Sequence, residues 1–348
     1  MKLRNSKDKM SGHESATRLP GSPNWRDAVS PDGQTWSSFR KTMVPRYIIV
    51  WRDICLCFLM IIIFLVMQVL TQRQWGPVVG LVTVPGFAFA VGFWLQALST
   101  FGHEAAHYNL AKTHSVNDLL AEWFIWPWFA QTVRNYRKSH WQHHLHLGDR
   151  QDTEISYHNC LSPWFLLKTL TGVLLVQTLF RYTRNNVKLS HEGVSSKPSV
   201  DQVASEGTAF ALVRTFVLNV FVVGMLTWFG MWTTAATWVV GVLVAFPCFA
   251  ILRQALEHRR YDASCQEDFL QSEHGPVNRM FRDGPFARYF GAAGFRRHLL
   301  HHWDPSISYT CFDEMEDFLM KTPLADRLAA ARSTYLATLV RLTQEAQN

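Results

Sequence analysis

The sequence has few charged residues and no paired cysteine motif. Charged residues make up 18% of the 348 positions, and the six cysteines include no CxxC pair and no even spacing. This pattern argues against a disulfide framework and against a thiolate zinc site, so we expect reduced, incidental thiols. A basic stripe with interleaved aromatic residues is also missing. Despite a net charge of +7, nothing in the sequence therefore indicates nucleic-acid binding.

Apolar residues are abundant instead. Hydrophobic residues make up 48% of the chain, with 14 Trp and 24 Phe, which is more than a soluble core usually needs. We expect no cleavable signal peptide, because the first apolar run begins too late. Residues 1–45 are rich in Ser, Lys, Gly and Pro and are predicted to form a flexible tail. Basic residues continue to Arg46 and Arg52, whereas the first turn carries only Arg73, so the positive-inside rule places the N-terminus in the cytoplasm.

Long apolar runs predict an all-α integral membrane fold. A helix needs about 20 residues to cross the hydrocarbon core, and several runs approach that length. We predict four transmembrane helices in two hairpins, at residues 54–71, 76–100, 209–229 and 231–252. They belong to a membrane domain over residues 46–312, which also carries interfacial helices and a cytoplasmic helical part. Residues 313–348 are predicted to form a C-terminal cytoplasmic helical tail.

Two shorter apolar segments are assigned to the membrane interface. Residues 119–130 are rich in Trp and interrupted by Pro127, which favours a segment lying on the bilayer. The run at 164–180 is ambiguous by length. The histidine clusters described next can form one site only if an even number of spans separates them. We therefore place 164–180 in the interface, which also puts both termini and the site in the cytoplasm.

Eight of the fifteen histidines fall into three tight clusters. They are His103 and His107; His140, His143 and His144; and His298, His301 and His302. Imidazole is the commonest protein ligand of first-row metals, and residues four apart share a helix face. Eight histidines exceed the three or four ligands of a zinc site and suit two metal ions with open positions. Nitrogen-rich sites with open positions suit iron and dioxygen, and the membrane setting suggests an apolar substrate.

The pattern HxxxH, HxxHH, HxxHH, with two spanning hairpins around it, resembles the membrane fatty-acid desaturase and lipid hydroxylase superfamily. The resemblance covers residues 46–309, and the stretch from His301 to Tyr309 is similar to that superfamily's HH-x-x-P-x-I-x-x-Y continuation. It implies a non-haem centre of two iron ions. The ligands that it implies are the eight clustered histidines and His258. It also implies a supporting amide at Gln254, which lies four residues before His258. We expect Glu104 and Asp152 to support the ligands by hydrogen bonding.

The resemblance implies oxygen-dependent oxidation of a lipid or fatty-acyl chain, with desaturation as the main expectation. Hydroxylation of a lipid, alkane or other apolar metabolite stays open, because both reactions use the same ligands. The chain contains no haem or flavin motif, so an external electron donor is expected, either a ferredoxin or a b-type cytochrome with its reductase. Arg134, Arg137 and Lys138 form a basic cluster that can dock such a carrier or face lipid headgroups.

One competing interpretation comes from the first motif. The sequence from His103 to His107 is a literal HExxH, in which two histidines bind zinc and Glu104 acts as the general base of a metalloprotease. Such a site needs one further ligand and leaves both HxxHH clusters unexplained. A metal transporter is disfavoured as well, because no ionisable residue lies in the middle of a predicted span.

Overall fold

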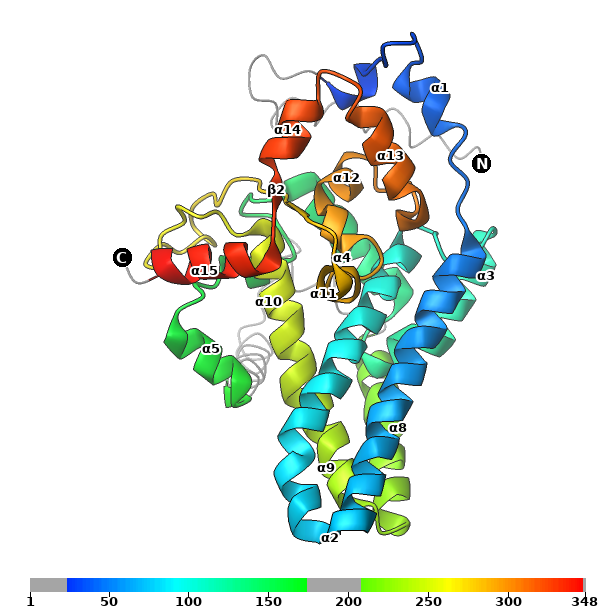
Figure 1. The fold of residues 1–348 in the computed structure, drawn as a ribbon, viewed down its shortest axis with the longest axis vertical. Coiled ribbons are helices and arrows are strands. Elements are labelled where there is room, and N and C mark those ends of the chain that lie inside the picture. Colours follow the sequence, from blue (N-terminus) through cyan, green and yellow to red (C-terminus); the bar gives the residue numbers. More distant parts are fainter. Residues whose placement is uncertain (1–23, 174–207, 347–348) are drawn as a thin grey trace, which may run out of the picture.

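The computed structural model describes residues 24–173 and 208–346, and it is helical for the most part (Figure 1). The α-helices are α1 (Trp36–Arg40), α2 (Tyr47–Ala106), α3 (His114–Leu120), α4 (Val133–His146), α5 (Pro163–Leu170), α8 (Thr208–Trp228), α9 (Trp232–Val240), α10 (Phe246–His258), α11 (Pro285–Phe290), α12 (His298–Trp303), α13 (Phe312–Leu319), α14 (Ala325–Ala330) and α15 (Tyr335–Glu345). Short 3₁₀ or π turns are η2 (Trp25–Asp27), η3 (Ala121–Ile125), η4 (Trp126–Trp128), η5 (Ile155–His158), η6 (Gly241–Ala245), η7 (Phe295–Arg297) and η8 (Tyr309–Cys311). Two short parallel strands, β1 (Met280–Phe281) and β2 (Arg332–Ser333), pair with each other.

Helix α2 reverses direction at Gly76, where φ is +84°, so that its two arms lie side by side (Figure 1). Glycine adopts this left-handed conformation without the steric cost that a β-carbon brings. A buried polar contact joins the arms: the Gln68 amide donates to the Gly80 carbonyl at 2.6 Å, and the Thr83 hydroxyl donates to Gln68. The first two predicted apolar runs are therefore the two arms of one bent helix.

The other two predicted runs form α8 and the continuous stretch α9–η6–α10. Among the described residues, three helices are long and apolar enough to cross a membrane: Tyr47–Ala106, Ala209–Trp228 and Trp232–His258. Small residues let the second arm of α2 approach this last helix closely. A β-carbon added to Gly92 would meet the Ala245 β-carbon at 2.4 Å. Close backbone approach through small residues is typical of helices packed within a bilayer.

The segments predicted to be interfacial form short helical pieces. Residues 119–130 span the end of α3 and the turns η3 and η4, with Trp123 and Phe124 exposed. Helix α5 covers the start of the 164–180 run and exposes Trp164, Leu167 and Leu170. The part of that run from residue 174 onward, and the loop that follows it to residue 207, lie outside the described residues.

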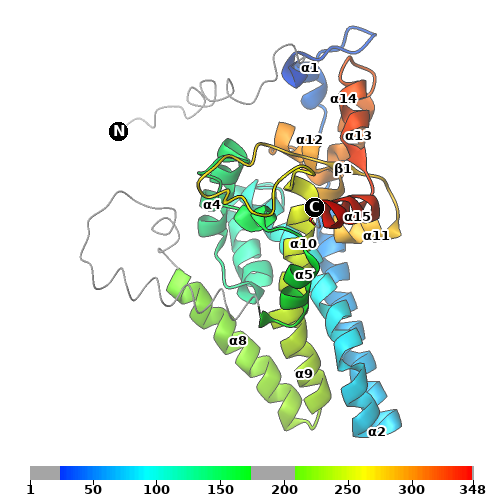
Figure 2. The same ribbon diagram turned by 90° about the vertical axis from the view of Figure 1, so that its left-hand side faces the viewer.

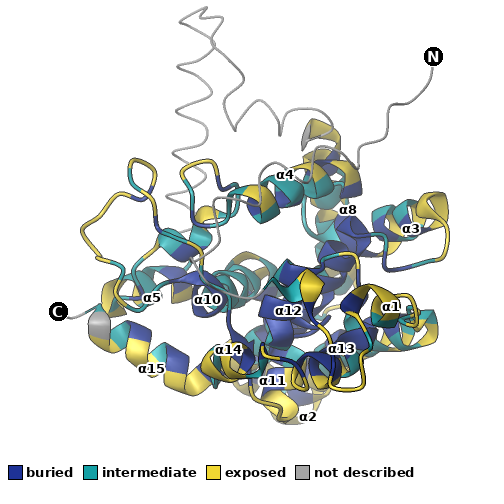
Figure 3. Ribbon diagram, turned by 90° about the horizontal axis from the view of Figure 1, so that it is seen from above, coloured by how far each residue is buried: buried dark blue, intermediate teal, exposed yellow. Residues whose placement is uncertain are grey.

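Helices α1, α4 and α11 to α15 gather at the upper end of the long helices in Figure 2, and we call this part of the protein the cap. Here the described part of the N-terminal tail packs against the C-terminal helices. The Trp36 ring is buried, and the Phe39 and Phe318 rings stack with centroids 4.4 Å apart. Arg40 forms an ion pair with Asp304. From Asn24 onward this segment is folded, in contrast to the flexible tail expected from its composition. From above, α12 lies near the middle of the cap and is largely buried (Figure 3).

A disulfide corrects the expectation that all six cysteines are reduced. Cys160 and Cys265 are bonded, with their α-carbons 5.1 Å apart and a sequence separation of 105. The pair was not predicted because no spacing motif connects cysteines that the tertiary fold brings together. Cys55, Cys57, Cys248 and Cys311 are free thiols, as expected.

Candidate metal centre

Nine histidines converge in the cap, and they are the nine that the sequence analysis selected. They come from the end of α2, from α4, from the last residue of α10 and from α12. Their ring nitrogens form two groups. We call His103, His107, His140, His144 and His301 cluster 1, and His143, His258, His298 and His302 cluster 2. Within each cluster, one nitrogen from every ring lies within 4.8 Å of the others, which is close enough for a shared metal ion.

Helix α4 supplies ligand candidates to both clusters because of its periodicity. His140 and His144 are four residues apart, share one face and join cluster 1, whereas His143 points to cluster 2. Helix α12 divides its histidines in the same way. His298 and His302 enter cluster 2, and His301 enters cluster 1. Each HxxHH motif therefore bridges the two clusters, which fixes them side by side.

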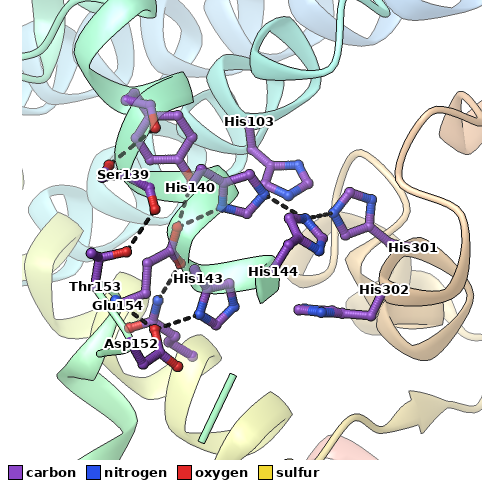
Figure 4. Close-up of polar contacts among 12 residues, drawn as sticks. His103, Ser139, His140, His143, His144, Asp152, Thr153, Glu154, His301 and His302 are labelled. Carbon is purple, nitrogen blue, oxygen red and sulfur yellow. Dashed lines mark hydrogen bonds and ion pairs between the residues drawn. The ribbon is translucent and has the colours of Figure 1, made fainter. Parts of the chain in front are cut away.

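The nitrogen atoms within each cluster face one another closely. In cluster 1, Nε2 of His144 lies 2.9 Å from Nε2 of both His140 and His301 (Figure 4). In cluster 2, Nε2 of His298 lies 2.9 Å from Nε2 of His258 and 3.1 Å from Nε2 of His302. Facing ring nitrogens of neutral imidazoles cannot all be hydrogen-bonded to one another. A metal ion shared by these nitrogens satisfies them together.

The environment keeps most of these rings neutral, which is the form that binds metals. Burial lowers the pKa of His144, His301 and His302 well below the usual value, and neighbouring imidazoles lower it further. His143 is an exception: burial lowers its pKa, but the negative charges of Glu154 and Asp152 outweigh that effect and raise it.

Carboxylates hold the outer nitrogens of two α4 histidines (Figure 4). Nδ1 of His140 lies 2.6 Å from Glu154, and Nδ1 of His143 lies 2.8 Å from Asp152. Asp152 also accepts a hydrogen bond from the Tyr157 hydroxyl at 2.5 Å. Each carboxylate fixes the ring orientation and directs Nε2 toward the cluster. Burial raises the pKa of Glu154, but His143 and His140 outweigh it and hold the pKa well below its usual range.

Two further residues selected from sequence lie beside the clusters but outside them. The Gln254 amide donates to Glu154 at 2.6 Å, so it supports the carboxylate that holds His140. Glu104 is fully buried, and its carboxylate accepts hydrogen bonds from the Asn109 side chain and the Tyr309 backbone. Its other oxygen lies 3.7 Å from Nδ1 of His103. A protease general base would have to face a metal-bound water, so these contacts argue against the HExxH interpretation.

Sequence reasoning missed a buried ion pair behind the clusters. Arg253 donates to Glu257 at 2.5 Å, and its guanidinium carbon lies 3.9 Å from the centre of the Phe295 ring. Phe295 in turn contacts the rings of His103 and His298, with centroids 4.5 Å and 4.8 Å away. An arginine and a glutamate four residues apart at the end of an apolar helix are a pattern that could have revealed the pair.

One residue of the basic cluster suggested as a docking site, Arg137, is held inside the protein, whereas Arg134 and Lys138 are exposed. The Arg137 guanidinium donates to the Ala105 and Ala106 carbonyls at the end of α2 and to the Asp118 carboxylate. It also lies over the Tyr108 ring at 3.9 Å. Arg137 therefore closes the C-terminus of α2 and does not project as a docking residue.

The other histidines near the site have different partners. Nδ1 of His146 lies 3.2 Å from Asp149, and the His114 ring stacks on Tyr108. His158 and His274 lie near each other, with ring centroids 5.6 Å apart, and belong to neither cluster. These four histidines therefore lie outside both clusters.

Comparison with known proteins adds one match. A family model described as fatty acid desaturase matches residues 79–329, a range that contains all nine clustered histidines. Comparison with curated proteins found no match.

Proposed function

The chain belongs to the fatty acid desaturase family, and on that premise we propose that it desaturates a lipid acyl chain with two iron ions and dioxygen. The observation that carries the proposal is the pair of adjacent histidine clusters bridged by α4 and α12. Iron ions held there would supply the dioxygen chemistry needed to remove hydrogen from an unactivated C–H bond. Removal of two hydrogens with one dioxygen, two electrons and two protons gives a double bond and two waters.

In this proposal the nine clustered histidines are the iron ligands. Glu154 and Asp152 orient two of them through Nδ1. Gln254 donates a hydrogen bond to Glu154, and Glu104 lies beside Nδ1 of His103. The electrons come from an external donor, either a ferredoxin or a b-type cytochrome with its reductase. Hydroxylation of a lipid or other apolar metabolite is the second candidate, because the same clusters serve both reactions.

We further propose that the two arms of α2, helix α8 and the α9–α10 stretch cross the membrane four times. The clusters and both termini then lie in the cytoplasm, as the excess of basic residues before Arg52 supports. Residues 46–312 would form the membrane domain and 313–348 its cytoplasmic tail. A reporter fused within 181–207 tests this arrangement, since an extracytoplasmic signal would overturn it.

Lipid profiling by mass spectrometry tests the reaction. Cells that express the chain should accumulate a lipid lacking two hydrogen atoms relative to its precursor. Gain of one oxygen atom would favour the hydroxylase instead. His301→Ala in cluster 1 and His258→Ala in cluster 2 should each abolish the product. His146→Ala is the matched control, because His146 lies on the same helix as cluster ligands but outside both clusters, and it should retain activity.

A further inference from the structure

Helix α15 runs across the direction of the long helices at the base of the cap, and part of its outer face is apolar (Figure 1). Leu336 and Val340 are four residues apart, share one face and are 71% and 44% exposed. Tyr335, Thr338 and Leu342 are buried on the opposite face. Seen from above, α15 lies at the edge of the protein with exposed residues along it (Figure 3). A single exposed leucine is ordinary, so the neighbours of this face decide what covers it.

Exposed apolar side chains continue from α15 onto two neighbouring helices. On α11, Phe286 is 58% exposed, and its ring lies 6.2 Å from the ring of Tyr335, the first residue of α15. On α5, Phe165 and Leu166 pack into the same core as the inner face of α15, while other side chains of this helix are exposed. We call the exposed set the apolar rim: Trp164, Leu167, Leu170, Phe286, Leu336 and Val340.

Contacts with the long helices give the depth of the apolar rim. The Phe286 ring lies 6.0 Å from the Phe93 ring of α2, and Phe93 lies 5.5 Å from Phe249 of α10. Phe93 and Phe249 belong to the predicted spans 76–100 and 231–252. Since the first span ends at residue 100, Phe93 lies about 10 Å inside that end along the helix. A side chain that contacts Phe93 from outside is therefore at the level of the hydrocarbon boundary.

Basic side chains accompany the apolar rim. The Lys168 amine lies 5.2 Å from the centre of the Trp164 ring on α5, and Arg288 is exposed two residues after Phe286 on α11. Aromatic rings at the hydrocarbon edge, with basic side chains that reach the headgroups, are typical of segments in the membrane interface. A soluble protein partner would have to displace lipid to reach this depth, so the bilayer is the occupant that the contacts favour.

We propose that α15 is a membrane-interface helix, which rests with α11 and α5 on the bilayer and inserts Leu336 and Val340 below the headgroups. Amphipathic helices of this kind bury their apolar face about 5–10 Å into the boundary between headgroups and acyl chains. The proposal rests on the proposed spans, and it anchors the tail 313–348 to the membrane on the side that carries the clusters. Tyr335 stacks on Phe281 at 3.7 Å, so the anchored helix also holds the strand pair β1–β2.

The test attaches a fluorophore to single cysteines of the full chain in phosphatidylcholine nanodiscs. Cys55→Ser is the background, because Cys55 is exposed whereas Cys57, Cys248 and Cys311 are buried. Leu336→Cys and Val340→Cys probe the apolar rim. Two further labels serve as matched controls.

Val82→Cys is the control for lipid contact, because Val82 lies in a proposed span and is 73% exposed, like Leu336. Met320→Cys is the control for water contact. Met320 is 42% exposed, like Val340, and it caps the end of α13, a helix that extends higher in the cap than α15 (Figure 1).

Each label is titrated with iodide in water and with phosphatidylcholine that carries a nitroxide near the top of its acyl chain. We expect the lipid nitroxide to quench both labels on α15 by about half, as at Val82→Cys, and iodide to quench them about fivefold less than at Met320→Cys. Iodide quenching equal to that at Met320→Cys would place α15 in the cytosol and overturn the proposal. Protection from both quenchers would also overturn it, since a second copy of the chain would then cover the face.

The Val82→Cys label separates this proposal from the spans on which it rests. Lipid quenching at Val82→Cys without lipid quenching on α15 would overturn the interface helix and leave the proposed spans standing. Iodide quenching at Val82→Cys would overturn the spans, and the interface helix with them. No turnover is measured, so neither result bears on the proposed oxidation.

Discussion

Nδ1 of His140 lies 2.6 Å from Oε1 of Glu154, and Oε2 of the same carboxylate accepts a hydrogen bond from Gln254. Glu154 thereby links α4 to α10 behind the two clusters. Glu154→Gln should lower iron affinity about 10- to 100-fold, because a neutral amide no longer makes the imidazole more basic. The iron content per chain, measured by elemental analysis after dialysis against increasing concentrations of a chelator, tests this loss of affinity.

Asp149→Asn is the matched control for that experiment. Asp149 contacts the ring of His146, which lies outside both clusters, in the way that Glu154 contacts His140. The control should keep its iron across the chelator series. Equal iron loss in the two variants would show that Glu154 contributes no more than any acid near α4.

Acid should destabilise the iron-free protein through its buried histidines. Burial and neighbouring imidazoles lower the pKa of His144, His301 and His302 below the unfolded value of about 6.5. As pH falls through 6.5 the unfolded chain takes up protons that the folded chain does not, so the free energy of unfolding decreases. The pKa of His103, His107 and His298 is lowered in the same way, whereas that of His143 is raised. Burial also raises the pKa of Glu104 and Glu257 to about 8, so these two groups add a little stability as pH falls from 8 to 6.5. Below pH 6.5 the histidines with lowered pKa outnumber the three groups with raised pKa, and we expect Tm to fall; a Tm that rises between pH 6.5 and 5.5 would contradict the prediction.

The disulfide between Cys160 and Cys265 should contribute measurably to stability. It joins the loop after η5 to the loop after α10, and it closes about 100 residues of chain, for which loop entropy alone gives up to about 4.7 kcal/mol. Dithiothreitol should lower the Tm of the wild type but not that of Cys160→Ser. Cys55→Ser removes a free, exposed thiol and should respond to the reductant like the wild type.

The same bridge tests the membrane orientation. Cytosolic reductants keep most cysteine pairs as thiols, so a cytoplasmic cap predicts that Cys160 and Cys265 are alkylated when cells are treated with a permeant maleimide before lysis. After purification in air and denaturation, only the four free cysteines should react. Protection of the pair in intact cells would place the cap in an oxidising compartment and contradict the proposed orientation.

Sequence was sufficient for features that depend on local spacing. Eight of the nine histidines were selected because residues three or four apart share a helix face, as at His140 and His144, and His258 was selected through the family resemblance. The apolar helices were identified because bilayer thickness sets their length. The distribution of each HxxHH motif between two clusters was not predictable, since it depends on how α4 and α12 face each other across the cap.

Long-range contacts account for the remaining differences. Arg137 looked like a surface charge because its carbonyl partners on α2 lie about thirty residues away in sequence. The segment around Trp36 looked flexible because its few apolar residues pack against Phe318, near the other end of the chain. In both cases the partner that orders the residue or segment lies far away in sequence, so local composition could not reveal it.

Gly148 gives the sharpest test of how the loop after α4 supports cluster 2. Its φ is +78°, and a β-carbon there would lie 2.2 Å from the Gly275 carbonyl carbon. Its amide donates to Asp152, which holds His143, and Gly275 lies two residues before the Val277 carbonyl that holds His258. Gly148→Ala should therefore displace both supports, lower the Tm and release iron from cluster 2.

The matched control is Gly33→Ala. Gly33 has a similar φ of +81°, but no atom lies within 4 Å of the position that a β-carbon would take, so alanine there meets only the left-handed backbone cost of about 1–2 kcal/mol. Gly148→Ala meets that cost and the collision with Gly275. Gly33→Ala should thus lower the Tm slightly and retain all its iron. Gly148→Ala should lose about half of its iron, because only the ion of cluster 2 is released. Equal effects of the two substitutions would show that alanine is disfavoured at position 148 by the left-handed backbone alone and not by the collision with Gly275.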